Sequence, residues 1–210
     1  MREQDRIPTG KVKRASKFVG TGARVGMNYI KHYVSGGKNR EELDRANAED
    51  IFNTLSELKG SALKMAQILS MDQHVLPEAY TKKFVMAQYS APPLSLPLVV
   101  KTFREAFGKS PFEIFKDFSK NAINAASMGQ VHSAVYNGTK VAVKVQYPGV
   151  ADSVESDLNM VKPFATKLVG VKGADVDQYF DEVKERLLEE TDYELELKRS
   201  MEMAERLKKL

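Results

Sequence analysis

The 210-residue sequence contains no cysteine and only three histidines, and these shortages exclude several kinds of chemistry. Without cysteine the chain has no disulfide bond, no thiolate metal ligand and no cysteine nucleophile, and it is compatible with a reducing compartment. The histidines, His32, His74 and His132, include no pair four residues apart, the spacing at which two imidazoles on one helix share a metal ion. We therefore expect no metal site built on histidine.

Long apolar runs are also missing. No uninterrupted stretch reaches the roughly 18 residues needed to cross a bilayer. The N-terminus is polar and charged and lacks the apolar core of a signal peptide. We therefore expect a soluble, cytoplasmic chain that is at most peripheral on a membrane. Its 42% of hydrophobic residues is nevertheless enough for one large or two small cores.

Basic charge is concentrated at the N-terminal end. Residues 1–40 carry ten Lys or Arg against Glu3 and Asp5, a net charge of +8, whereas the rest carries 22 basic and 26 acidic residues, or −4. Residues 11–34 mix these cations with spaced apolar residues, as in a basic amphipathic helix. Such a helix could lie on an anionic membrane or dock on the domain behind it. Nucleic-acid binding is not expected, because interleaved aromatic residues and a recognisable binding fold are missing.

The clearest periodicity lies in residues 41–71, where apolar residues recur at alternating steps of four and three. These residues are Ile51, Leu55, Leu58, Ala62, Met65 and Leu69. The spacing predicts one continuous core-facing helix. Gly60, Lys64 and Gln67 fall on its opposite side. Lysine and glutamine there usually face water, but a mid-helix glycine costs about 1 kcal/mol relative to alanine, which indicates that another backbone approaches Gly60.

A β-hairpin is predicted near residue 130. Two β-branched runs, residues 129–136 and 140–146, flank Asn137-Gly138, the strongest short-range signal for a two-residue hairpin turn. The other amphipathic segments predict helices, with a break at Gly170 to Gly173 before the last one. These segments are residues 77–89, 97–107, 150–168 and 175–208.

The hairpin carries the residues that indicate chemistry. Small side chains at Ala125, Ala126, Ser127 and Gly129 would let backbone approach a triphosphate, and Lys144 in Val-Ala-Val-Lys would place a cation beside it, an order that resembles the N-lobe of a kinase. A lysine facing water on an edge strand is the ordinary alternative. The lysine would need a carboxylate partner on the last helix. The candidates are Glu185, Glu189, Glu190 and Asp192.

Three motifs resemble those of the UbiB (AarF, ADCK) family of atypical kinases. The run AASMGQVH from Ala125 resembles the family's alanine-rich loop. KMAQ from Lys64 resembles its KxGQ motif, and Glu190-Thr191-Asp192 resembles its ExD motif. Together with Lys144, these matches occur in family order over residues 50–200.

The resemblance implies an α+β fold, in which a mostly helical extension precedes a protein-kinase-like N-lobe with a small antiparallel sheet and a long C-type helix. Together with the basic N-terminal segment, it predicts three parts, a basic N-terminal helix over 1–40, a helical KxGQ-type extension over 41–110 and the N-lobe over 111–210, and we expect the C-lobe to be absent. The basic helix also supports a different reading, a non-catalytic module that binds a membrane surface or another protein.

The resemblance also implies a nucleotide site for ATP and Mg²⁺. Its binding residues would be Ala125, Ala126, Ser127, Met128, Gly129, Gln130 and Lys144. Lys144, Glu190 and Asp192 would be catalytic, with Lys144 and Glu190 forming a buried pair. Lys64 and Gln67 would form a regulatory lid that contacts Glu190 and Asp192.

The implied activity is ATP hydrolysis or small-molecule phosphorylation linked to ubiquinone or another isoprenoid lipid. Ala66 replaces the glycine of the KxGQ motif, and Asn124 stands where a third alanine is common. No catalytic-loop Asp with its Asn and no DFG motif occurs in the 210 residues, and these groups hold Mg²⁺ in kinases. We therefore expect a fragment, or a split or degenerate form, that is incompetent without a C-lobe in cis or in trans.

Overall fold

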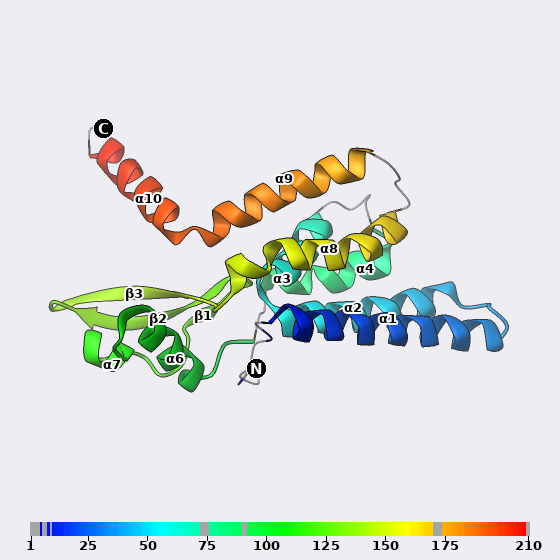
Figure 1. Cartoon of the computed structure of the whole chain (residues 1–210), viewed down its shortest axis with the longest axis horizontal. Helices are drawn as coiled ribbons and strands as arrows, with labels where there is room; N and C mark the ends of the chain where they lie inside the picture. Colours follow the sequence, from blue (N-terminus) through cyan, green and yellow to red (C-terminus); the bar gives the residue numbers. More distant parts are fainter. Residues whose placement is uncertain are drawn as a thin grey trace.

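Figure 1 shows the computed structural model, which describes residues 5, 8, 10–71, 76–89, 92–169 and 174–208. Helices form one end of the molecule, and a three-stranded antiparallel sheet with short helices beside it forms the other. The last two helices run above both ends (Figure 1). This arrangement confirms the predicted α+β class.

The helical end is built on a buried apolar stripe. Its elements are α1 (Lys11–Val34), α2 (Arg40–Leu58), α3 (Gly60–Met71), α4 (Glu78–Phe84), α5 (Met86–Tyr89) and α8 (Val150–Val169). In Figure 1, α1 lies beside α2, and α3 lies beside α8. Every residue of the predicted stripe between Ile51 and Leu69 is buried. The period of the sequence therefore identified the core face correctly.

The prediction of one continuous helix over 41–71 was wrong, because the helix is interrupted at Lys59 and Gly60. Both residues have positive φ angles, 52° and 58°. The backbone N–H of Gly60 donates to the carbonyl of Ser127 at 2.8 Å, instead of to a carbonyl of its own helix. A Cβ atom on Gly60 would lie 3.3 Å from Val150. The expected backbone approach at Gly60 is thus present, but it occurs at a helix junction.

The predicted hairpin is present. It consists of β2 (Gly129–Tyr136) and β3 (Thr139–Gln146), paired antiparallel, with Asn137 and Gly138 both at positive φ as a two-residue turn requires. A short strand not predicted from the sequence, β1 (Asn124–Ala125), adds to the other edge of β2.

One face of the sheet is covered by aromatic side chains. Beside it lie α6 (Leu96–Phe107) and α7 (Pro111–Ile114) (Figure 1). Phe103 of α6 meets Phe118 edge to face, and the ring of Phe118 stacks on His132 at 4.7 Å between centroids. His132 is fully buried, and this burial lowers the pKa of its imidazole. Because aromatic side chains cover this face, a binding site on the sheet would have to lie on the opposite face of β2 and β3.

The long helix predicted over 175–208 is also interrupted. The structure contains α9 (Ala174–Thr191) and α10 (Tyr193–Leu207), which diverge at Asp192 (Figure 1). The Asp192 carboxylate accepts a hydrogen bond of 2.9 Å from the N–H of Leu195 and so caps α10. The break expected at Gly170 to Gly173 lies outside the described residues.

Helix α1 has one docked face and one exposed face. Arg14, Phe18 and Thr21 are buried against the neighbouring helices. Val12, Val19, Met27, Ile30 and Val34 are exposed. Both uses considered for this helix are therefore compatible with its packing. Across the described ranges, no helix combines the length and apolar content that crossing a bilayer requires. The division into 1–40, 41–110 and 111–210 stays a prediction.

Candidate functional site

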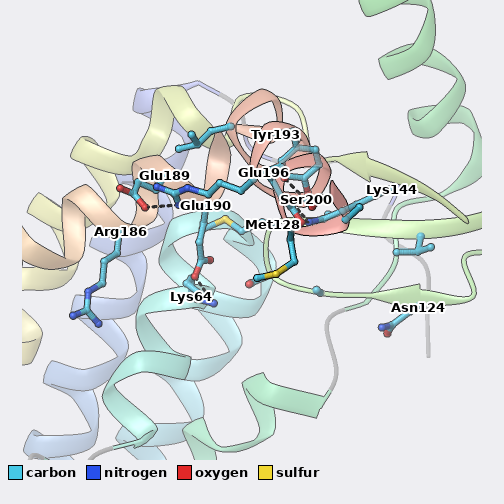
Figure 2. A pocket seen from close by; sticks show the side chains of 18 of the residues that line it. Lys64, Asn124, Met128, Lys144, Arg186, Glu189, Glu190, Tyr193, Glu196 and Ser200 are labelled. Carbon is cyan, nitrogen blue, oxygen red and sulfur yellow. Dashed lines mark hydrogen bonds and ion pairs between the residues drawn. The ribbon is translucent and has the colours of Figure 1, made fainter. Parts of the chain in front are cut away.

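A pocket of about 1010 Å³ opens between the hairpin and the two C-terminal helices (Figure 2). Its floor is the loop of Ala126 to Gly129 together with Lys144 of β3. Its other walls come from α9 and α10, and Lys64 reaches it from α3. Three parts of the chain that are distant in sequence therefore contribute to one cavity: α3, the hairpin with the loop before it, and the α9–α10 pair.

The backbone of the loop is held at three points. Ala126 N–H donates to the Gly129 carbonyl at 2.8 Å, which closes a tight turn. The next two carbonyls accept from outside the loop, Ser127 from Gly60 and Met128 from the N–H of Tyr147 at 3.0 Å. The loop therefore has a defined position at the floor of the pocket even though most of its side chains are small.

Not every residue predicted for the loop faces the pocket. Ala126, Ser127, Met128 and Gly129 line it, whereas Ala125 and Gln130 do not. The Gln130 side chain lies on the closed face of the sheet, where its Oε1 accepts from the N–H of Leu94 at 2.6 Å and its Nε2 contacts His132. It is 1% exposed. The prediction that Gln130 contacts nucleotide is therefore wrong for its side chain, because alternate residues of a strand face opposite sides.

Lys144 reaches the pocket, but its partner is not the predicted one. Its Nζ lies 2.6 and 2.7 Å from the two carboxylate oxygens of Glu196 on α10, and 4.4 Å from the centre of the Tyr193 ring. The side chains of the pair are 47% and 51% exposed. The buried pair of Lys144 with Glu190 is thus not formed, because Glu190 pairs with Lys64 and Lys144 pairs with Glu196 of α10, which follows the break at Asp192 on the side of β3 (Figure 1).

Lys64 meets Glu190, as predicted. The two charged groups are 2.8 Å apart and join α3 to α9 at the edge of the pocket (Figure 2). Gln67 does not reach the acidic motif. Its Nε2 donates to the Ala87 carbonyl at 2.5 Å, and its Oε1 accepts a long bond of 3.4 Å from the Ser127 hydroxyl. The predicted contact of Lys64 with Glu190 is therefore present, whereas Gln67 contacts the loop at Ser127 and not the acidic motif.

Asp192 is not assembled with the other site residues. It lies outside the pocket lining, and its carboxylate caps α10. The remaining pocket charges are mostly paired across the α9–α10 angle, where Arg199 binds Glu189 at 3.0 Å. Within the described residues no group of three His, Asp or Glu side chains could hold a metal ion.

Sequence reasoning missed Glu196 and Tyr193. Both follow Asp192, a strong N-cap residue, and a helix restarting there would have placed Glu196 one turn along it. Burial raises the pKa of the Tyr193 hydroxyl to about 12, and the carboxylates of Glu196 and Glu190 add to the shift. Residue type and spacing were therefore sufficient to find them, once the break was recognised.

Comparison with known proteins gives consistent matches. Residues 86–210 match the family described as the ABC1 atypical kinase-like domain. The nematode (Caenorhabditis elegans) protein "Atypical kinase coq-8, mitochondrial" is 38% identical over 73% of the chain and 21% of its own length. "Atypical kinase COQ8B, mitochondrial" of Rattus norvegicus is 32% identical over 91% of the chain and 38% of its own length. "Atypical kinase COQ8, mitochondrial" of Saccharomyces cerevisiae is 32% identical over 90% of the chain and 40% of its own length.

The solved structures that match include the complex of Rv3197 with erythromycin from Mycobacterium tuberculosis. It is 35% identical, with a TM-score of 0.38, and the match covers 73% of this chain and 40% of the other. The chain thus spans between about a fifth and two fifths of the length of the relatives described above.

Proposed function

The chain belongs to the ABC1 atypical kinase-like family, and from this membership we propose that its pocket binds the phosphates of ATP. The main observation that supports the proposal is that two phosphate-binding features lie in one cavity. A loop built mostly from small residues and Lys144 line the same space. Backbone N–H groups and one cation are the groups that bind phosphate in kinase N-lobes.

The donor set of the pocket fits an anion better than a free metal ion. Lys64, Lys144, Arg186 and Arg199 supply positive charge along its lining. The carboxylates opposite them already neutralise part of this charge, and Lys144 is held by Glu196. We propose that this ion pair keeps the Lys144 side chain extended into the pocket, where phosphate oxygens would compete with Glu196 for the ammonium.

Mg²⁺ enters the proposal with the nucleotide and would neutralise phosphate charge. Such an ion is usually held by phosphate oxygens, water and one or two carboxylates. Glu189, Glu190 and Glu196 line the pocket, but each forms an ion pair with Lys or Arg. We propose that the metal-binding carboxylates belong to a kinase C-lobe, supplied in cis or in trans, and that the 210 residues alone have no turnover.

The KxGQ-type segment of α3 has the proposed role of a lid. Lys64 fixes α3 to Glu190, and Gln67 contacts Ser127 of the loop, so movement of α3 would alter both walls of the pocket. Following the family resemblance, we propose that the full-length protein hydrolyses ATP or phosphorylates a small molecule linked to ubiquinone or another isoprenoid lipid. A cytoplasmic location stays a prediction, because relatives from three organisms are named as mitochondrial.

Substitution of Lys144 tests the phosphate site. Lys144→Met should weaken the affinity of the chain for ATP with Mg²⁺ by about tenfold or more, because one charge-assisted contact to phosphate is lost. Lys140→Met is the matched control, since Lys140 lies on the same face of β3 but outside the pocket lining. Isothermal titration would measure both. Equal affinities for the two variants would remove the phosphate role of Lys144.

A second function is favoured by the exposed stripe of α1. Val12, Val19 and Ile30 lie on one side of the helix, exposed beside Lys13 and Lys31. Apolar side chains flanked by cations fit the surface of an anionic bilayer. We propose that this face docks on acidic lipid while the opposite face stays packed on the protein.

Vesicle sedimentation tests the lipid surface. The chain should sediment with acidic vesicles at low salt and lose this binding on neutral vesicles or at high salt, since salt screens surface charge. Val19→Asp should reduce sedimentation several-fold, because a charge replaces apolar contact. Ile123→Asp, an exposed apolar position away from α1, should leave it unchanged. Binding that ignores salt and Val19→Asp would contradict a role for this face.

A further inference from the structure

Lys59, at the junction of α2 and α3, is a buried cation that the proposed site does not use. It is 0% exposed and has a positive φ angle of 52°, a conformation that is costly for a residue with a side chain. Its ammonium donates to the Pro92 carbonyl and lies 4.5 Å from the centre of the Tyr147 ring. No carboxylate pairs with it among the described residues, and burial lowers its pKa to about 8.

Burying an ammonium without a counter-ion costs free energy, because the charge loses its hydration, whereas methionine or leucine would occupy a similar volume without this cost. The cation–ring contact and the bond to Pro92 offset only part of that cost. The position of Lys59 therefore indicates a role beyond packing, and the contacts of the residues around it indicate which role.

The residue whose ring contacts the Lys59 ammonium and the residue that follows Lys59 in the chain both bind the alanine-rich loop. Tyr147, whose ring lies beneath the ammonium, donates its N–H to the Met128 carbonyl. Gly60, the next residue after Lys59, donates its N–H to the Ser127 carbonyl. Two successive loop carbonyls are thus held by the two chain segments that Lys59 joins.

We propose that Lys59 is a positioning residue, whose contact with the Tyr147 ring clamps the α2–α3 junction to the end of β3 and so fixes the loop at the floor of the pocket. The clamp sets the relative position of the Gly60 and Tyr147 amides, and through them the position of Ser127 and Met128. The positioning of the loop by Lys59 is inferred from the structure alone, whereas its effect on ATP binding rests on the proposed function.

The ring of Tyr147, and not its hydroxyl, makes the contact. The hydroxyl is buried and has no hydrogen-bond partner within the described part of the chain. Tyr147→Phe should therefore preserve the clamp, whereas Tyr147→Leu removes the aromatic face. This pair of substitutions separates loss of the cation–ring contact from loss of a polar group.

Hydrogen exchange of the nucleotide-free chain tests the clamp directly. Lys59→Met and Tyr147→Leu should each speed exchange at the Gly60 and Tyr147 amides by on the order of tenfold. The amides of Val135 and Val141 near the hairpin turn should keep their rates. Tyr147→Phe should match the parent, and adding Tyr147→Leu to Lys59→Met should produce little further change, because one contact is removed in both.

Affinity for ATP with Mg²⁺ is measured on the same variants. It should fall about tenfold in Lys59→Met and Tyr147→Leu and stay unchanged in Tyr147→Phe. Exchange that rises uniformly along the chain, or not at all, overturns the positioning role. If Lys59→Met does not fold, the comparison of Tyr147→Leu with Tyr147→Phe decides. A parent chain that does not bind ATP contradicts the proposed function, while the exchange rates still decide the clamp.

Discussion

Gly129 shows how closely single residues define the loop. A Cβ atom there would lie 2.6 Å from the Val145 carbonyl oxygen and 2.6 Å from the Tyr193 hydroxyl. The first of these atoms belongs to the backbone of β3 and cannot move without disturbing the hairpin. Glycine at this position is therefore required by the close approach of the hairpin strands and α10, where any side chain would collide.

We predict that Gly129→Ala lowers the free energy of unfolding by about 1–3 kcal/mol, as overpacking does in a closed site. Gly26→Ala in α1 is the control of opposite sign, because nothing lies within 4 Å of the added atom and alanine favours a helix by about 0.5–1 kcal/mol. Urea unfolding would compare the two variants. A Gly129→Ala protein as stable as the parent would show that the loop relaxes without cost.

Residue-level predictions of the site succeeded where spacing alone determines position. Lys64 was expected opposite the core stripe and within reach of Glu190, and the helical period was sufficient for that. The partner of Lys144 depended on the direction of the chain after Asp192, which the period does not contain. Gln130 was misplaced because the motif was considered as a unit, although residues of a strand alternate between its faces.

At the scale of elements, the hairpin and most of the helices were predicted, and two helix breaks were missed, one of which could not be predicted from the sequence. The period continues through Lys59 because Leu55 and Leu58 on one side, and Ala62 on the other, all contribute to the same core. The break there is imposed by tertiary contact, since Gly60 gives its N–H to Ser127. The break at Asp192 has a local cause, an N-cap, and was accessible from the sequence.

At the scale of the whole molecule, one buried ion pair joins α1 to the centre of the helical end. Arg14 binds Asp157 of α8 through two contacts, of 2.7 and 2.5 Å, with side chains 3% and 0% exposed. The guanidinium also donates to the Leu58 carbonyl at 2.9 Å, and Ser61 and Ser153 donate to the carboxylate. Helices α1 and α8 and the α2–α3 junction therefore meet at a single charge pair.

We predict that Arg14→Met destabilises the chain by about 3–5 kcal/mol, because it leaves the Asp157 carboxylate buried without its counter-ion. Lys17→Met is the matched control on the same helix. Its pair with Glu57 is about half exposed on both sides, so its loss should cost at most about 1 kcal/mol. Urea unfolding at constant pH would measure both. Combining Arg14→Met with Asp157→Leu should restore much of the lost stability, since no charge is then left buried. If the double variant were less stable than Arg14→Met, the pair itself, and not the unpaired charge, would hold α1 in place.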